Sequence, residues 1–217
     1  MVLVNHLFML PKTKRNVEQR YKLKTPETIE LAKQYGKEYF DGPRTICYGG
    51  YKYDGRWVQV AKRFIDFYEL KPGDKILDIG CAKGFLLHDF KKLMPTLEVK
   101  GLDISDYAIE NSMEDVKPYL EIGNASKLSY PDNSFDLVIS INTIHDLPQK
   151  ECRNAVREIQ RVSRKHSYIV VDSFKDKQDK ERILKWNVTL ETILSANDWE
   201  RLYKEEGYTG DYYWFTP

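Results

Sequence analysis

Short apolar runs alternate with amphipathic stretches along most of the chain beyond residue 71. The runs have the length of buried strands, and the stretches between them place apolar residues at helical spacing. Strands are expected at 75–79, 98–102, 119–122, 135–141 and 168–171, and helices at 85–93, 107–115 and 149–162. Strands that alternate with helices are joined by right-handed βαβ crossovers. The pattern therefore predicts an α/β domain with a parallel sheet.

The pattern is less regular toward the C-terminus. Residues 188–194 form a candidate strand, and 212–215 form a candidate last strand. Between them, Ser195 has the residue type of a helix N-cap, and a helix is expected from there to residue 206.

The N-terminal part is polar and rich in tyrosine after an apolar start. Residues 1–10 are expected to dock on the domain as a strand or a helix. One helix is predicted from Thr25, an N-cap type followed by proline, to residue 39, and a second from 56 to 68. We therefore divide the chain into an extension and cap, 1–70, and a main domain, 71–217, within one structural unit.

Charge and composition argue against several classes of protein. Lys and Arg number 34 and Asp and Glu 33, and nucleic-acid binders depend on many cationic contacts to phosphate, so no nucleic acid is expected as a partner. No run approaches the roughly 20 apolar residues of a membrane span, and no signal peptide is recognised. Three widely spaced cysteines argue against a disulfide framework and fit a reduced, cytoplasmic compartment. No cluster has metal-ligand spacing, so no metal is expected.

The strongest chemical signal is a glycine-containing turn after the first predicted strand, Asp78-Ile-Gly80-Cys81-Ala82-Lys-Gly84. Such a turn lets a ligand approach the backbone and directs a helix N-terminus at it. The spacing is one residue short of a P-loop, and Ala82 and Phe85 stand where a dinucleotide fingerprint has glycine. The carboxylate of Asp78 suits a cationic ligand better than a pyrophosphate.

This turn resembles motif I of the class I, Rossmann-like methyltransferases that use S-adenosylmethionine, with Ala82 in place of the middle glycine. The resemblance implies an α/β fold with a mostly parallel sheet, one antiparallel strand, helices on both faces and an N-terminal helical cap. It also implies that S-adenosylmethionine is the cofactor. The residues of the turn that it assigns to the cofactor are Asp78, Gly80, Cys81, Ala82 and Gly84.

Further matches extend the resemblance over roughly residues 72–172. Asp103 ends the second strand, where an acidic residue accepts hydrogen bonds from ribose hydroxyls, and Ile104 follows it. Asn124, followed by Ala125, stands where the family commonly has an aspartate that accepts from the adenine amino group; a simple turn asparagine is the alternative. The resemblance places Ser140 and Ile141 beside the methionine part of the cofactor.

His145 follows the fourth strand and is the candidate catalytic residue. An imidazole can accept the proton of a hydroxyl acceptor as a general base, or it can only orient the substrate or pack. A methyl transfer by SN2 displacement, most simply to oxygen, is expected in either case.

The segment Tyr48-Gly-Gly-Tyr51-Lys-Tyr53-Asp-Gly-Arg56-Trp57 is the candidate substrate site. Its aromatic rings can wall a pocket, and Arg56 or Arg44 can bind a carboxylate or phosphate through two hydrogen bonds. A hydrophobic lid without ligand contacts is the alternative. The basic residues at Lys12, Lys14, Arg15, Arg20, Lys22 and Lys24 are expected to form a solvated face; an anion site is the alternative.

The acceptor is expected to be a small molecule, because the residues after the fourth strand lack the motifs of nucleic-acid methyltransferases. The segment at 48–57 and the Gly-Tyr-Thr-Gly-Asp sequence near the end resemble a bacterial subgroup associated with capsule or surface-sugar biosynthesis. A sugar or phosphoramidate-type capsular precursor is thus the first candidate, and a nitrogen acceptor the second. A non-catalytic binding protein and an NAD-dependent oxidoreductase are the alternatives of a different class.

Overall fold

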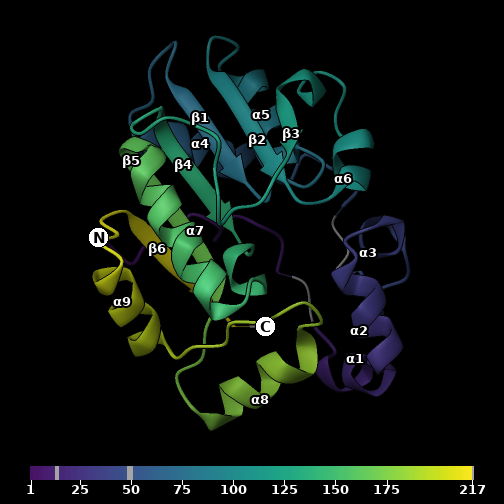
Figure 1. Cartoon of the computed structure of the whole chain (residues 1–217). Helices are drawn as coiled ribbons and strands as arrows, with labels where there is room; N and C mark the ends of the chain where they lie inside the picture. The colour runs from purple at the N-terminus through teal and green to yellow at the C-terminus, as the bar shows by residue number, and fades with distance from the viewer. Residues whose placement is uncertain (13–14, 48–50, 217) are drawn as a thin grey trace.

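The computed structural model describes residues 1–12, 15–47 and 51–216, and a six-stranded sheet forms its centre in the order β3-β2-β1-β4-β5-β6 (Figure 1). The strands are β1 (Lys75–Ile79), β2 (Glu98–Asp103), β3 (Leu120–Ile122), β4 (Phe135–Ile141), β5 (Ser163–Asp172) and β6 (Asp211–Phe215). The strand order reverses between β1 and β4. Ligands of open α/β sheets bind outside the carboxyl ends of the strands at such a reversal.

The expected antiparallel strand is wrong, because every pairing between the six strands of the described sheet is parallel. The last strand, β6, pairs with β5 from Tyr168–Asp211 to Asp172–Phe215. Two helices, α8 (Lys177–Trp186) and α9 (Ala196–Glu205), lie between these strands in the chain. Such a crossover returns the chain to the amino end of the sheet, whereas an antiparallel neighbour needs only a hairpin.

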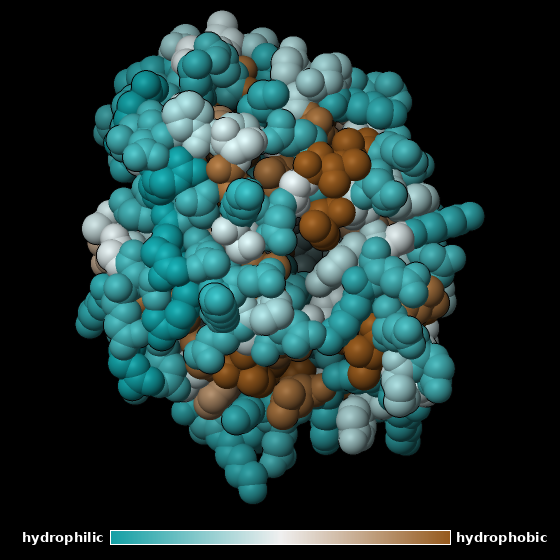
Figure 2. All heavy atoms as spheres, viewed as in Figure 1, coloured by the Kyte–Doolittle hydropathy of each residue, from teal (hydrophilic) through white to brown (hydrophobic). Residues whose placement is uncertain are grey.

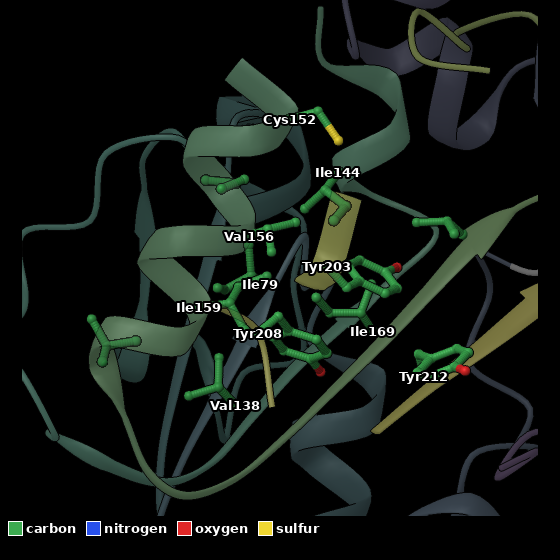
Figure 3. Close-up of a cluster of buried hydrophobic side chains, with 14 of the residues drawn as sticks. Ile79, Val138, Ile144, Cys152, Val156, Ile159, Ile169, Tyr203, Tyr208 and Tyr212 are labelled. Carbon is green, nitrogen blue, oxygen red and sulfur yellow. The ribbon is translucent and has the colours of Figure 1, made fainter. Parts of the chain in front are cut away.

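Helices cover both faces of the sheet, and the alternation of side chains decides which face each strand residue contacts. Leu77 and Ile79 pack with α7 (Gln149–Val162) and α9, whereas Ile76 packs with α4 (Val58–Phe67) and α5 (Phe85–Leu93). Figure 3 shows the side chains of α7 turned toward the sheet and toward the tyrosines near the C-terminus. The expected bounds of β1, α5, β4 and α7 are confirmed.

A group of short helices lies at the carboxyl end of the sheet (Figure 1). It comprises α1 (Val17–Leu23), α2 (Pro26–Lys33) and α3 (Lys37–Asp41), with α6 (Asp106–Glu110) and α8 nearby. The helix expected from Thr25 to residue 39 is broken, because Tyr35 has a φ of 49° and cannot continue a right-handed helix. Ala32, Phe40 and Ala108 share a small core that joins α2 and α3 to α6.

Other differences concern one expected strand and three helices. The strand expected at 188–194 does not form; one isolated bridge, Phe174 with Ser195, lies beside it. The helix expected at 107–115 ends at Glu110, and α1 and α8 were not predicted. Only Ile183 and Trp186 of α8 are buried, so its sequence carries little apolar periodicity.

The apolar start of the chain docks on the outer edge of β6 as expected. The backbone N–H of Val4 donates to the Tyr212 carbonyl at 2.9 Å, and that of Tyr212 donates to Val2 at 3.0 Å. Hydrophilic residues cover most of the face shown in Figure 2, with smaller hydrophobic groups between them. Within the described ranges, no helix combines the length and the apolar composition that crossing a bilayer requires.

Candidate functional site

A cleft of about 850 Å³ opens at the carboxyl ends of the strands, and residues of the N-terminal part, 1–70, form one side of it. This volume lies in the upper part of the range of about 300–1,000 Å³ for small-molecule sites. The cleft is lined by the turn after β1, the ends of β2 and β4, the cap and the residues after α8. Of the predicted site residues, it brings together Asp78, Gly80, Cys81, Ala82, Asp103, Ile104, Asn124, Ala125, Ile141, His145, Tyr51, Arg56 and Trp57.

The turn after β1 has the backbone that its glycines predict. Gly80, Ala82 and Gly84 have φ values of 78°, 50° and 74°, all in the left-handed region. A Cβ on Gly80 would lie 2.0 Å from the Thr143 hydroxyl, so only glycine permits this approach. Ala82 keeps the left-handed backbone at the position where the family motif has glycine, at a cost of about 1 kcal/mol. Gly84 caps α5 and does not line the cleft.

Two carboxylates stand at the ends of β1 and β2. Both oxygens of Asp103 accept backbone hydrogen bonds, Oδ2 from Ala82 at 2.7 Å and Oδ1 from Ser105 at 2.9 Å. No hydrogen bond reaches the carboxylate of Asp78 from any described residue, although its exposed fraction is only 5%. Burial, and then the charge of Asp103, raises the pKa of Asp78 to about 7. A buried carboxylate without a partner fits a cationic ligand.

These residues fit S-adenosylmethionine, whose methionine part carries a positive sulfur and an ammonium group. Asp78 supplies the unpartnered negative charge, and Asp103 retains lone pairs for ribose hydroxyls. The Asn124 amide oxygen already accepts the backbone N–H of Ser126 at 2.8 Å, as a turn asparagine does, and its second lone pair has no hydrogen-bond donor among the described residues. Ser140 does not line the cleft; its buried hydroxyl has no hydrogen-bond partner in the described part of the chain.

His145 is 2% exposed and is held by the backbone of β5. The N–H of Asp172 donates to its Nδ1 at 2.8 Å, so the neutral ring carries its hydrogen on Nε2. That nitrogen lies 3.5 Å from Oδ1 of Asp146. Burial raises the pKa of Asp146 to about 6, and Asp146 also lines the cleft. In this arrangement Nδ1 of neutral His145 is occupied, Nε2 faces Asp146 without a hydrogen bond, and the open proton acceptor is the Asp146 carboxylate.

The N-terminal aromatic segment is divided by the structure. Tyr51 and Trp57 line the cleft, whereas Tyr53 turns away and donates its hydroxyl to Asp89 at 2.7 Å. Arg56 also lines the cleft, but its guanidinium pairs with Asp54 at 2.6 Å. Tyr48 falls outside the described residues. Direct contact of this segment with a substrate stays a prediction.

The expected solvated face is wrong for three of the basic residues, Arg15, Arg20 and Lys24, and Lys14 lies outside the described residues. Arg20 is buried, and its Nε donates to the Trp186 carbonyl at 2.7 Å. Lys24 donates to the carbonyls of Leu184 and Asn187. The last carbonyls of a helix have no partner within it and carry partial negative charge, so they attract cations. Arg20 and Lys24 thereby fix the end of α8, which forms one wall of the cleft.

Sequence reasoning missed several residues of this cleft. Asp146 adjoins His145 in the same segment and was visible as a second titratable group. Trp186, Asn187 and Thr189 follow a helix that was not predicted, and no motif marks them. The described residues contain no group of three His, Cys, Asp or Glu that could hold a metal ion, and the three cysteines there are buried and free.

Known proteins with similar sequences are methyltransferases. A family model described as a methyltransferase domain matches residues 70–209. Demethylmenaquinone methyltransferase of Symbiobacterium thermophilum is 34% identical over 51% of this chain and 48% of its own length. Phosphoethanolamine N-methyltransferase 3 of Arabidopsis thaliana is 31% identical over 43% of this chain and 20% of its own. The chain therefore matches between a fifth and about half of the length of these two relatives.

Solved structures show the same fold at low sequence identity. The YcgJ protein of Bacillus subtilis has a TM-score of 0.56 at 20% identity, over 67% of this chain and 66% of its own. An S-adenosylmethionine-dependent methyltransferase of Aquifex aeolicus has a TM-score of 0.51 at 18% identity, over 89% of both chains. With the sheet, the glycine turn and the family match in agreement, the chain belongs to the methyltransferase domain family and has the Rossmann-like fold of the class I S-adenosylmethionine-dependent methyltransferases.

Proposed function

We propose that this protein transfers the methyl group of S-adenosylmethionine to a small-molecule acceptor. The observation that supports this most directly is the pair of carboxylates, Asp78 and Asp103, on either side of a left-handed glycine turn. Asp78 has no partner within the described chain and therefore suits a cation. A pyrophosphate of NAD at the same place would be repelled by this charge.

In this proposal the cofactor supplies an activated methyl group on a positive sulfur. Asp103 holds the ribose, Asn124 accepts from the adenine, and the segment of Ile141 contacts the methionine part. The other residues proposed to contact the cofactor are Gly80, Cys81, Ala82, Ile104 and Ala125, whereas Gly84 and Ser140, which do not line the cleft, are no longer assigned to it. The protein's main contribution is placement, because a nucleophile held in line at roughly 3 Å can gain about 7–11 kcal/mol over free encounter.

A hydroxyl acceptor must also lose a proton, and we propose that His145 and Asp146 act together. Oδ1 of Asp146 is buried and has no hydrogen-bond partner in the described part of the chain. A carboxylate with a pKa raised to about 6 is ionised at neutral pH and is more basic than usual. His145, held by the Asp172 N–H, directs its Nε2 hydrogen toward this carboxylate. The proton of the acceptor hydroxyl then passes directly to the Asp146 carboxylate, and the imidazole, whose Nδ1 is occupied by the Asp172 N–H, orients this carboxylate.

An oxygen of a sugar or phosphoramidate-type capsular precursor is the first candidate acceptor. The support is the resemblance at 48–57 and the presence of Arg56 and Trp57 in the cleft. A nitrogen acceptor is the second candidate, because relatives such as ajmaline N-methyltransferase of Rauvolfia serpentina, 31% identical over 61% of this chain, are named for such a reaction. Tyr51, which also lines the cleft, would contact the acceptor in either case.

Calorimetry with S-adenosylmethionine and with NAD tests the proposal. We expect the methyl donor to bind and NAD not to bind. Asp103→Ala should weaken binding by more than about tenfold, because it removes a charged acceptor of two hydrogen bonds. Asp103→Asn, which keeps one acceptor oxygen, should lose less. Asp132→Ala, an exposed surface variant, is the control. Equal affinity of Asp103→Ala and wild type would refute the ribose assignment, and binding without transfer to any acceptor would favour a non-catalytic protein.

A further inference from the structure

Arg15 occupies an unusual position between the cap and the sheet. It precedes α1, is half-buried and lines the cleft. Its guanidinium carbon lies 4.5 Å from the ring centroid of Phe215 and 5.6 Å from that of Trp186. Both aromatic residues also line the cleft. The guanidinium therefore stacks against two aromatic residues of the cleft wall.

Arg15 carries its charge there without a direct partner. Within residues 1–12, 15–47 and 51–216, no hydrogen bond or ion pair reaches its guanidinium. Burial lowers the pKa of Arg15; Asp172 opposes this effect, while Arg182 and Arg44 add to it. Arg56 and Arg20, by contrast, are held by a carboxylate and by backbone carbonyls. A half-buried cation next to two other cations is costly unless an anion offsets it.

The stacking also determines which ligand fits. A guanidinium stacked on aromatic faces keeps its N–H donors in its own plane, at its free edge. Those donors match the paired oxygens of a carboxylate or a phosphate. Lys12 and Arg44 line the same cleft and add positive charge.

We propose that Arg15 is a substrate-binding residue and that the methyl acceptor carries an anionic group, a phosphate or a carboxylate, bound at the free edge of its guanidinium. This inference rests on the proposed function and specifies its substrate class. Specificity follows from charge, because a neutral analogue would leave the Arg15 guanidinium half-buried and unpaired.

The direct test is NMR of the ¹⁵N-labelled full chain with bound S-adenosylhomocysteine. The Nε–H signal of Arg15, assigned from its absence in Arg15→Lys, is followed as inorganic phosphate, acetate or neutral glucose is added. We expect phosphate or acetate to shift this signal saturably and glucose to leave it unchanged. The anion that binds more tightly, phosphate or acetate, identifies the anionic group of the acceptor as a phosphate or a carboxylate. The signal of Arg201, an exposed arginine on α9, is the internal control.

Variants supply the second readout. Calorimetry with the stronger anion should show at least about a tenfold loss of affinity in Arg15→Gln and a smaller loss in Arg15→Lys, which keeps the charge but not the paired donors. Arg201→Gln has the same net charge as Arg15→Gln and should bind as wild type does. An unshifted Arg15 signal, or equal affinity in Arg15→Gln, would overturn the inference.

The two proposals fail in different ways. Affinity for S-adenosylmethionine is measured on the same samples. If S-adenosylmethionine binds but the affinity for the anions does not depend on Arg15, only the proposed substrate class is wrong. If the methyl donor does not bind, the proposed function itself is wrong.

Discussion

The ammonium group of Lys83 lies 2.7 Å from Oδ1 of Asp41, and this ion pair joins the glycine turn of the sheet to the last residue of α3. The hydroxyl of Tyr107, on α6, donates to the other oxygen of Asp41 at 2.6 Å. Only 10% of the Lys83 side chain is exposed. The cap is thus fastened to the same turn that is proposed to hold the cofactor.

Replacing Asp41 with asparagine should therefore affect both stability and binding. We expect a loss of about 1–3 kcal/mol in the free energy of unfolding, since a charge-assisted pair of low exposure is broken. Urea unfolding measures this loss, and calorimetry should show weaker binding of S-adenosylmethionine. Asp66→Asn, which breaks the exposed pair of Lys62 and Asp66, is the matched control and should change the free energy by less than about 1 kcal/mol. Equal effects of the two variants would contradict a fastening role for Asp41.

The affinity for S-adenosylmethionine should depend on pH through Asp78. Burial and the charge of Asp103 raise the pKa of this carboxyl to about 7, and only its ionised form attracts a cation. Affinity should then rise as the pH increases from 6 through 7 and level off above, by up to about tenfold per pH unit on the acid side. Calorimetry at several pH values measures this. Asp78→Asn should bind more weakly and lose this pH dependence; a variant that retains it would assign the titration elsewhere.

His145→Ala should reduce turnover and leave the affinity for the methyl donor nearly unchanged, because the imidazole is proposed to orient the Asp146 carboxylate that takes the proton of the acceptor. General acid–base groups contribute typically about 10²–10⁴-fold in rate. Asp146→Asn should lose a similar factor, and the double variant should lose little more than either single one, since the two groups act as a unit. Steady-state kinetics with an acceptor that the wild type methylates provide the measurement. Full activity of His145→Ala would remove its catalytic role.

His6 should make stability depend on pH, independently of the cleft. Its buried ring packs against Phe64, Phe67 and Tyr168 at centroid distances of 4.6–4.9 Å, and burial, with the charge of Arg63, lowers its pKa from 6.5 to about 4. The unfolded chain therefore binds more protons than the folded one between these values. Stability from this group is complete above pH 6.5 and is lost as the pH falls toward 4.

Replacing His6 with leucine tests this directly. The variant should show a flatter decline in the free energy of unfolding between pH 6.5 and 4 than the wild type, as measured by urea unfolding at fixed ionic strength. Parallel curves for the two proteins would place the titrating group elsewhere.

The local sequence determined the central strands, the helices packed on them and the glycine turn with its two carboxylates. The apolar runs of β1 and β4 and the periodicity of α5 and α7 each bury one continuous stripe, so their bounds follow from the sequence pattern alone. The glycine turn could also be predicted from the sequence, because a left-handed backbone and the approach of Thr143 to Gly80 require glycine or another small residue there. Asp78 and Asp103 were placed by their position at strand ends.

The tertiary structure alone decided which side chains surround the cleft. The break at Tyr35, the helix α8 and the direction of β6 depend on contacts between segments far apart in the chain, which no local pattern records. The same holds for Arg15, which the sequence places in a run of exposed-looking basic residues, and for the tautomer of His145, which the backbone of Asp172 fixes. Periodicity indicates which face of a segment is buried, but not which distant group it is buried against. The charge and geometry of the cleft depend on those long-range neighbours.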